Sequence, residues 1–526
     1  MNNITLFIIL LTIVTALAEV TDKIRIPYPI LLVLVGMVIG FIPGLPRAEL
    51  DPEIVFLIFL PPILYAAAWT TSWPDFKKAK RPITLLAIGC VIFTTCAVAA
   101  VSHYFIPGFS WAEAFVLGAI ISPPDAIAAT AATKGLGVPK RVITILEGES
   151  LVNDATGLIA YRYAVAAVVT GAFSLSEASL QFFFVAIGGI FFGLLLGWIF
   201  KWIHKITPDN PTTDTALTFL VPFIAYLGAE QFHMSGVLAV VTSGLFLSWN
   251  ASEIFSQRSR LQANGTWDTV IFLLNGIIFI LIGLQLPAVL ENIHDIPLST
   301  LLFYGAIVSL AVIIGRIIWV YPGAYIPRVS KRVREREPLV DIRLVTVTAW
   351  SGMRGVVSLA AALALPLTLS NNQAFANRSL IIFITFCVIF STLVIQGLSL
   401  RPLINWLGIK PDAQEHIDEQ EARFKIAVAV INRIEEEFSL SLSDDVLNQI
   451  KTKYEIRIQR LQKDQTKRRI DEDQIIEFHR VQHELLSMER RHIIQMRREG
   501  NISDEALRKI EYELDLEETR LILEKK

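Results

Sequence analysis

Five ionisable residues lie deep inside apolar stretches of this sequence: Asp125, Glu149, Asp154, Arg162 and Arg354. Charged side chains are costly in a membrane interior and mark functional sites by default. Asp125, Asp154 and Arg354 each lie 14 residues into the apolar segment that contains them. At a rise of ~1.5 Å per residue this is about 21 Å along a helix. The spacing therefore predicts that these three charges meet near the middle of a bilayer.

The residues around Asp154 and Asp125 have the chemistry of a site for a monovalent cation. Ser150 lies one helical turn before Asp154, so its hydroxyl shares a face with the carboxylate. Pro123 and Pro124 precede Asp125 and break its helix, which frees main-chain carbonyls. Oxygen atoms of these kinds bind hard cations at broken transporter helices. The alternative is that these polar groups only pair between helices.

The other buried charges favour structural roles. A buried carboxylate is stabilised by a buried cation, so Glu149 is predicted to pair with Arg354 and hold two crossing helices together. Asn153 is expected to position main chain beside the site and is included among its cation- and proton-binding residues. Arg162 lies eight residues beyond Asp154 on the same face. It is a candidate gating residue at the outer entrance, or it packs against a partner that the sequence does not identify.

Exchange of two ions follows from a buried carboxylate. Desolvation disfavours its charged form, whereas a bound cation favours it. A site at Asp154 therefore holds either a proton or a cation, and each displaces the other. If only the neutralised site crosses readily, the two flows are coupled.

The elements that must position these residues are membrane-spanning helices. Of 526 residues, 53% are hydrophobic and only 18% are charged, below the quarter that soluble domains usually carry. A span needs about 20 apolar residues. Thirteen candidates are predicted, at 3–21, 28–45, 53–71, 82–106, 111–133, 140–171, 175–206, 212–230, 233–250, 266–290, 298–326, 340–367 and 378–408.

The basic residues of the loops agree with this count. Thirteen spans put nineteen Lys and Arg on the side of the C-terminal tail, and only Arg47 and Arg378 on the other. Cytoplasmic loops are rich in Lys and Arg, so the tail is predicted to be cytoplasmic and the N-terminus external. No Lys or Arg precedes the first span, which favours a retained helix over a cleaved signal.

Two spans are interrupted, and their positions correspond. The fifth contains Pro123 and Pro124, and the twelfth contains Gly352 and Gly355. Seven spans separate them, so two six-span halves of opposite orientation are predicted. Interrupted helices at matching positions of inverted repeats indicate a transporter's binding site.

The chain divides into an apolar and a charged part. Residues 1–410 are predicted to form the membrane domain and 411–526 a cytoplasmic tail, with helical patterns near 417–438, 446–461 and 475–496. The three cysteines lie in apolar spans and lack metal-ligand spacing. Neither a cofactor nor a nucleic-acid partner is indicated, and the tail's partner is unknown.

Three motifs resemble bacterial sodium/proton exchangers of the first monovalent cation:proton antiporter family. They are Ser122-Pro-Pro-Asp-Ala, Glu147-Gly-Glu-Ser-Leu-Val-Asn-Asp-Ala-Thr-Gly-Leu and Gly352-Met-Arg-Gly-Val-Val-Ser-Leu-Ala. The resemblance implies a homodimer in the inner (plasma) membrane, with dimerisation helices at roughly 1–71 and 175–290. A moving core, at roughly 82–171 and 298–408, would work by an elevator-like motion.

The resemblance also implies roles for individual residues. Asp154 matches the family's main cation- and proton-binding acid, Asp125 and Ser150 its supporting ligands, and Glu149 with Arg354 its structural ion pair. Asn153 matches the electroneutral members. One departure is Ala66, where many members carry an acid. Another is Pro-Pro-Asp, where many relatives read Thr-Asp-Pro.

These observations predict an all-α polytopic membrane antiporter, not an enzyme, that exports Na⁺, or else Li⁺ or K⁺, against inward H⁺. A potassium/proton antiporter is the nearest alternative. An intramembrane aspartyl protease would need two acids sharing a water, but the sequence lacks the expected Gly-x-Gly-Asp element. A channel or a sensor would be favoured if ion flux were uncoupled.

Overall fold

Every element that the structure, a computed structural model, describes is a helix. The described residues are 3–24, 27–42, 53, 55–133, 136–171, 175–207, 209–291, 293, 296–336, 341–368, 375–409, 413–438, 447, 451–452, 454–455, 458, 472–499, 510 and 513–519. The chain forms two compact units, Met1–Asp412 and Ala413–Lys526. The predicted boundary, at residue 410, lies close to this division.

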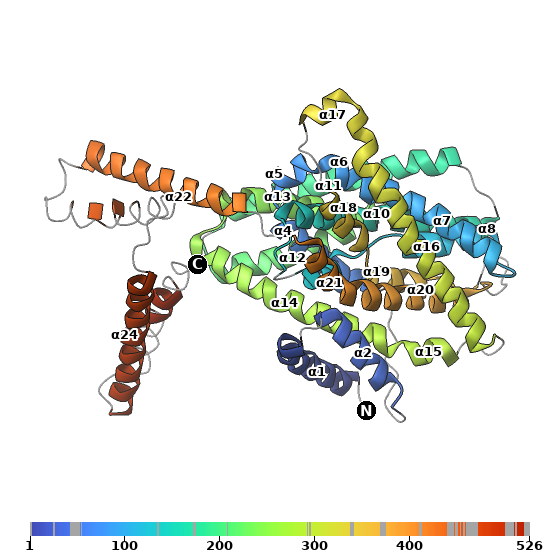
Figure 1. The fold of residues 1–526 in the computed structure, drawn as a ribbon, viewed down its shortest axis with the longest axis horizontal. Helices are drawn as coiled ribbons and strands as arrows, with labels where there is room; N and C mark the ends of the chain where they lie inside the picture. The colour runs from blue at the N-terminus through green and yellow to red at the C-terminus, as the bar shows by residue number, and fades with distance from the viewer. Residues whose placement is uncertain are drawn as a thin grey trace. The chain divides into compact units, whose positions relative to one another are not determined.

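Each predicted span contains a helix or a short series of helices (Figure 1). In the first half these are α1 (Asn3–Ile24), α2 (Tyr28–Gly40), η1 (Val55–Phe59) with α4 (Leu60–Thr70), α6 (Lys80–Thr84) with η2 (Leu85–Cys90) and α7 (Val91–Phe105), α8 (Trp111–Ile121) with α9 (Ala126–Thr133), and α10 (Lys140–Thr170). The short helix α5 (Trp73–Lys78) joins α4 to α6.

The rest of the membrane unit continues in the same way. Its helices are α11 (Leu175–Ile206), α12 (Pro211–Gln231), α13 (Gly236–Ile254), α14 (Gln257–Leu284) with α15 (Leu286–Glu291), α16 (Leu298–Tyr325), η3 (Ile326–Val329), α17 (Lys331–Arg336), α18 (Ile342–Trp350) with α19 (Val356–Leu363), and α20 (Arg378–Ser391) with η4 (Thr392–Gln396) and α21 (Gly397–Leu407).

Six helical runs of the described residues are long and apolar enough to cross a membrane, and four more apolar helices are shorter. The interrupted spans fall short because their breaks limit each piece, and α10 because it carries several charges. The count of thirteen crossings therefore stays a prediction.

Both predicted helix breaks are confirmed. α8 ends at Ile121 and α9 begins at Ala126, so the break contains Pro123 and Pro124. α18 ends at Trp350 and α19 begins at Val356, so the second break includes Gly352 and Gly355.

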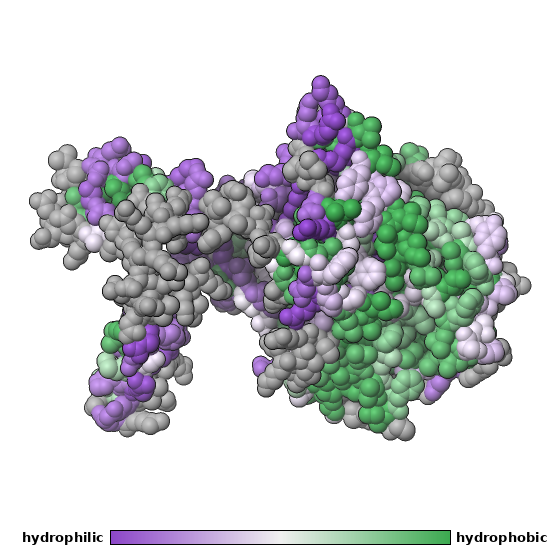
Figure 2. Space-filling model, in the orientation of Figure 1, coloured by the Kyte–Doolittle hydropathy of each residue, from purple (hydrophilic) through white to green (hydrophobic). Residues whose placement is uncertain are grey.

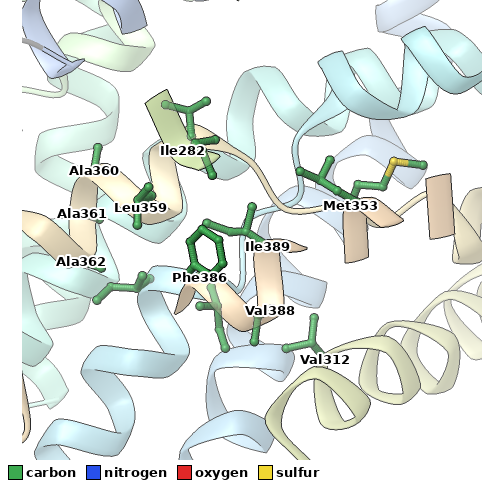
Figure 3. Close-up of a cluster of buried hydrophobic side chains, with 14 of the residues drawn as sticks. Ile282, Val312, Met353, Leu359, Ala360, Ala361, Ala362, Phe386, Val388 and Ile389 are labelled. Carbon is green, nitrogen blue, oxygen red and sulfur yellow. The ribbon is translucent and has the colours of Figure 1, made fainter. Parts of the chain in front are cut away.

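Apolar packing surrounds the second break. Figure 3 shows α19 residues such as Leu359 against Phe386 and Ile389 of α20, with Met353 from the break in the same buried cluster. The face of the membrane unit drawn in Figure 2 carries large hydrophobic areas, as expected of a surface that contacts lipid. The second break is therefore buried within the apolar core.

The tail unit contains α22 (Ala413–Arg433), η5 (Ile434–Phe438) and α24 (Glu472–Arg498). These cover the first and third predicted tail helices. Most of the second, at 446–461, lies outside the described residues.

Candidate functional site

The two helix breaks and α10 meet through hydrogen bonds to main-chain carbonyls. The Asp125 N–H donates to the carbonyl of Met353, with an N···O distance of 2.8 Å. The Asn153 side chain donates from Nδ2 to the carbonyl of Pro124, at 2.6 Å. The predicted role of Asn153 in positioning main chain is therefore confirmed, and segments more than 200 residues apart form one junction.

Asp154, Asp125 and Ser150 line a single cavity of about 690 Å³ at this junction. Asp154 is 7% exposed. Asp125 accepts a hydrogen bond at Oδ1 from the N–H of Ile127, at 2.8 Å. The structure thus brings together the three residues predicted to bind the cation.

Asp154 is buried without a compensating charge. Within the described part of the chain, its carboxylate forms no hydrogen bond or salt bridge, and its charged neighbour Asp125 has the same sign. An isolated ionised carboxylate is very unfavourable in a low-dielectric interior. Ionisation of Asp154 is therefore unfavourable unless a positive charge lies beside it.

The rest of the cavity wall is mainly apolar, and the charged residues in it are acidic. Glu147 of α10 and Asp268 of α14 line it, whereas none of the described lining residues is Lys, Arg or His. A cleft lined by one sign of charge concentrates ions of the opposite sign. Ala66 also lies in this wall.

Sequence reasoning missed the contribution of α14. Asn264, Asp268 and Asn275 share one face of this helix and line the cavity, and the Oδ1 of Asn275 is buried without a hydrogen-bond partner among the described residues. The signal was available in the sequence, because these polar residues recur at helical spacing, four and seven apart.

The predicted ion pair between Glu149 and Arg354 is wrong. Arg316, in the middle of α16, holds Glu149 with two hydrogen bonds, Nη1 to Oε1 at 2.6 Å and Nη2 to Oε2 at 2.8 Å. Both side chains are almost fully buried. A bidentate pair is the strongest form of this contact. Arg316 therefore compensates the charge of Glu149 without Arg354. Arg316 could have been included among the candidate residues, because it is a lone charge in an apolar run.

Arg354 instead binds main-chain carbonyls at the two breaks. Its Nε donates to the carbonyl of Ile121, the last residue of α8, at 2.6 Å, and its Nη1 donates to the carbonyl of Gly352. Its own N–H donates to Oγ1 of Thr392. The carboxyl end of a helix carries partial negative charge, so Arg354 stabilises the end of α8 at the junction.

Arg162 lies beyond the cavity-lining residues of α10 and has a partner on α12. Its Nη2 contacts Oε2 of Glu230 on α12 at 2.7 Å, and Oε1 of Glu230 accepts from the N–H of Gly236. Arg162 is half exposed. It therefore joins α10 to α12 rather than lining the site.

Gly355 is required by its contact with Asp125. A Cβ at this position would lie 1.8 Å from Oδ2 of Asp125. We expect Gly355→Ala to displace the carboxylate and abolish most transport, with an overpacking cost of about 1–3 kcal/mol. Gly265→Ala on α14 is the matched control, because no atom lies within 4 Å of the added methyl. Equal transport rates of the two variants in proteoliposomes would contradict this.

Two interrupted helices crossing at a buried, uncompensated acid define a secondary transporter. Residues 8–406 match the family model described as "Sodium/hydrogen exchanger, transmembrane". An uncharacterised Na⁺/H⁺ exchanger of Mycobacterium tuberculosis is 34% identical over 95% of this chain and 92% of its own length. The sodium, potassium, lithium and rubidium/H⁺ antiporter of Bacillus pumilus is also 34% identical, over 80% of this chain and 65% of its own length.

The fold agrees with these sequence relationships. The sodium proton antiporter MjNhaP1 of Methanocaldococcus jannaschii aligns with a TM-score of 0.63 and 20% identity, over 77% of this chain and 98% of that chain. The chain belongs to the sodium/hydrogen exchanger family, and it is a bacterial membrane transporter rather than an enzyme.

Proposed function

We propose that this protein exchanges cytoplasmic Na⁺ for external H⁺ at Asp154. The observation that carries the proposal is the buried carboxylate of Asp154, which lacks a protein counter-charge in an acidic cavity. A proton and a cation each neutralise this group, so they compete for it. Asp125, Ser150 and Asn153 complete the site as supporting ligand, hydroxyl ligand and positioning amide.

The cavity reaches the cytoplasmic side if the basic loops are cytoplasmic. Thr70 at the end of α4, Glu147 near the start of α10 and Asn264 near the start of α14 all line it. Lys and Arg residues cluster within or beside each of these helix ends, which is typical of the cytoplasmic side. This conformation is therefore interpreted as open to the cytoplasm, with the N-terminus outside.

Inverted repeats and an elevator-like motion account for the helix contacts. If each span of the first half is matched to the span seven places later, α1, α2 and α4 correspond to α12, α13 and α14. The contact of α2 with α14 then corresponds to that of α13 with α4, and the contact of α1 with α14 to that of α12 with α4. The cavity lies between α4 and α14 of the proposed dimerisation helices and α9, α10 and α19 of the proposed core. Movement of the core past this scaffold would expose Asp154 to the other side.

A homodimer is proposed from the surface of α11. Large apolar side chains remain exposed along this helix, including Phe184, Phe191 and Trp198. Such a face packs against lipid or a second copy of the chain, and α11 belongs to the proposed dimerisation helices.

The proposed function has two versions, which differ in the transported cation. The relative from Bacillus pumilus is named for sodium, potassium, lithium and rubidium, so a K⁺/H⁺ antiporter is the second candidate. Electroneutral exchange is proposed from Asn153, which precedes Asp154 where electrogenic relatives carry a second acid.

Proteoliposomes loaded with a pH-sensitive dye and a preset proton gradient test the proposal. Adding Na⁺, Li⁺ or K⁺ in turn should dissipate the gradient only for transported cations. A response to Na⁺ supports the main proposal, and a response to K⁺ alone supports the alternative. Flux without proton movement would instead indicate a channel.

The contact between Arg162 and Glu230 predicts a latch that favours the cytoplasm-open state. It joins α10 of the proposed core to α12 of the scaffold, and exposed pairs contribute about 0.2–1 kcal/mol. We expect Arg162→Gln and Glu230→Gln each to change the apparent KM for cytoplasmic Na⁺ by no more than about fivefold. The double variant should match either single variant, and additive effects would show that the two residues act separately.

A further inference from the structure

A second, smaller cavity of about 140 Å³ lies where α6, η2, α10, α16 and α18 come together. These helices contact one another in the membrane unit (Figure 1). The cavity is lined near the start of α6, α10 and α18 and near the end of α16. With the orientation proposed above, all of these ends are cytoplasmic.

The lining combines positive charge with apolar walls. Its charged residues are Arg81, Arg141 and Asp341, a net charge of plus one, and Asp341 already caps α18 by accepting from the N–H of Arg343. The remaining lining is mainly apolar and includes Leu85, Leu86, Ile145, Val320, Leu344 and Val345. Trp319 also lines the cavity, and Trp is enriched at membrane interfaces.

We propose that this cavity binds the headgroup phosphate of an anionic phospholipid of the cytoplasmic leaflet. Guanidinium groups match phosphate oxygens, and basic pockets between helices on the cytoplasmic side bind anionic headgroups. The volume is well below the ~300–1,000 Å³ of drug-sized ligand sites, so it suits a phosphate group rather than a nucleotide.

The surface beside the cavity provides a path for the acyl chains. Leu310, Ile314 and Ile318 are exposed, four residues apart along α16. They form an apolar stripe that leads along the helix to Trp319 and the cavity. A lipid, unlike free phosphate, would bind this stripe and the charged mouth together.

The bound lipid would brace the proposed core. Thr348 lines the cavity, and its carbonyl accepts a hydrogen bond from Nη2 of Arg316, at 3.1 Å. Arg316 in turn holds Glu149. A lipid wedged between α10, α16 and α18 therefore supports the helices that carry this ion pair.

Native mass spectrometry of the full-length protein, titrated with phosphatidylglycerol or phosphatidylcholine, tests the proposal. We expect Arg81→Gln/Arg141→Gln to weaken phosphatidylglycerol binding about 25-fold, from about fivefold for each arginine. Lys77→Gln/Lys78→Gln on the neighbouring α5 is the matched control and should bind as the wild type does. Asp154→Asn should also retain the lipid, so this test does not depend on transport.

Equal phosphatidylglycerol affinity in the wild type and the double variant would overturn the proposal. So would equal affinity of the wild type for phosphatidylcholine. Displacement of the lipid by millimolar inorganic phosphate would indicate a free-anion site instead. If the double variant does not fold, Arg141→Gln alone should show about a fivefold loss, because its side chain is exposed.

Discussion

Asp154→Asn should abolish cation/proton exchange while leaving the protein folded. The amide occupies nearly the same volume, but it neither releases a proton nor neutralises a cation. The wild-type carboxylate is buried and has no salt bridge within the described part of the chain, so its removal breaks no ion pair. Transport is measured by dye dequenching in proteoliposomes after addition of Na⁺, Li⁺ or K⁺.

The control for this variant is Asp75→Asn, the same chemical change on α5. Asp75 is partly exposed and contacts Lys78, so this variant should transport at the wild-type rate. Equal thermal unfolding of Asp154→Asn and wild type would show that the fold is intact. Continued pH-linked cation flux in Asp154→Asn would remove the proposed mechanism.

Much of the membrane unit could be predicted because a bilayer imposes strong rules. Apolar length marked the spans, and Pro123, Pro124, Gly352 and Gly355 marked the breaks that the structure contains. Local sequence also explains why the first break is not helical, since the consecutive prolines Pro123 and Pro124 cannot donate helical hydrogen bonds. The membrane topology and the dimer depend on the bilayer and on a second chain, so local sequence does not determine them as it determines the breaks.

The pairing of buried charges was harder to predict because it depends on which helices are neighbours. Arg316 and Arg354 are both lone cations in apolar spans, and either could have faced Glu149. α16 packs against α18, and Gly352 leaves room for the Arg316 side chain. This packing places Arg316 rather than Arg354 beside Glu149. Asp268 could have been noticed from its helical spacing with Asn264 and Asn275, but the contact of α14 with the cavity depends on the same helix packing.

Loss of either Glu149 or Arg316 should destabilise the protein by about 3–5 kcal/mol, because the remaining charge is buried and unpaired. Glu149→Ala/Arg316→Ala should cost much less than the sum of the single changes. The free energy of unfolding is measured for the wild type, the single variants and the double variant in mixed detergent micelles.

The cycle with Arg354 in place of Arg316 decides between the two arginines. Arg354 binds the carbonyls of Ile121 and Gly352, so Glu149→Ala/Arg354→Ala should be much closer to additive. The half-exposed pair Lys201–Glu253 provides a reference of about 0.2–1 kcal/mol. Stronger coupling of Glu149 to Arg354 than to Arg316 would mean that the ion pair is rearranged in the protein in solution. Because Glu149 precedes Ser150 on α10, such a rearrangement would also move the Ser150 hydroxyl at the proposed cation site.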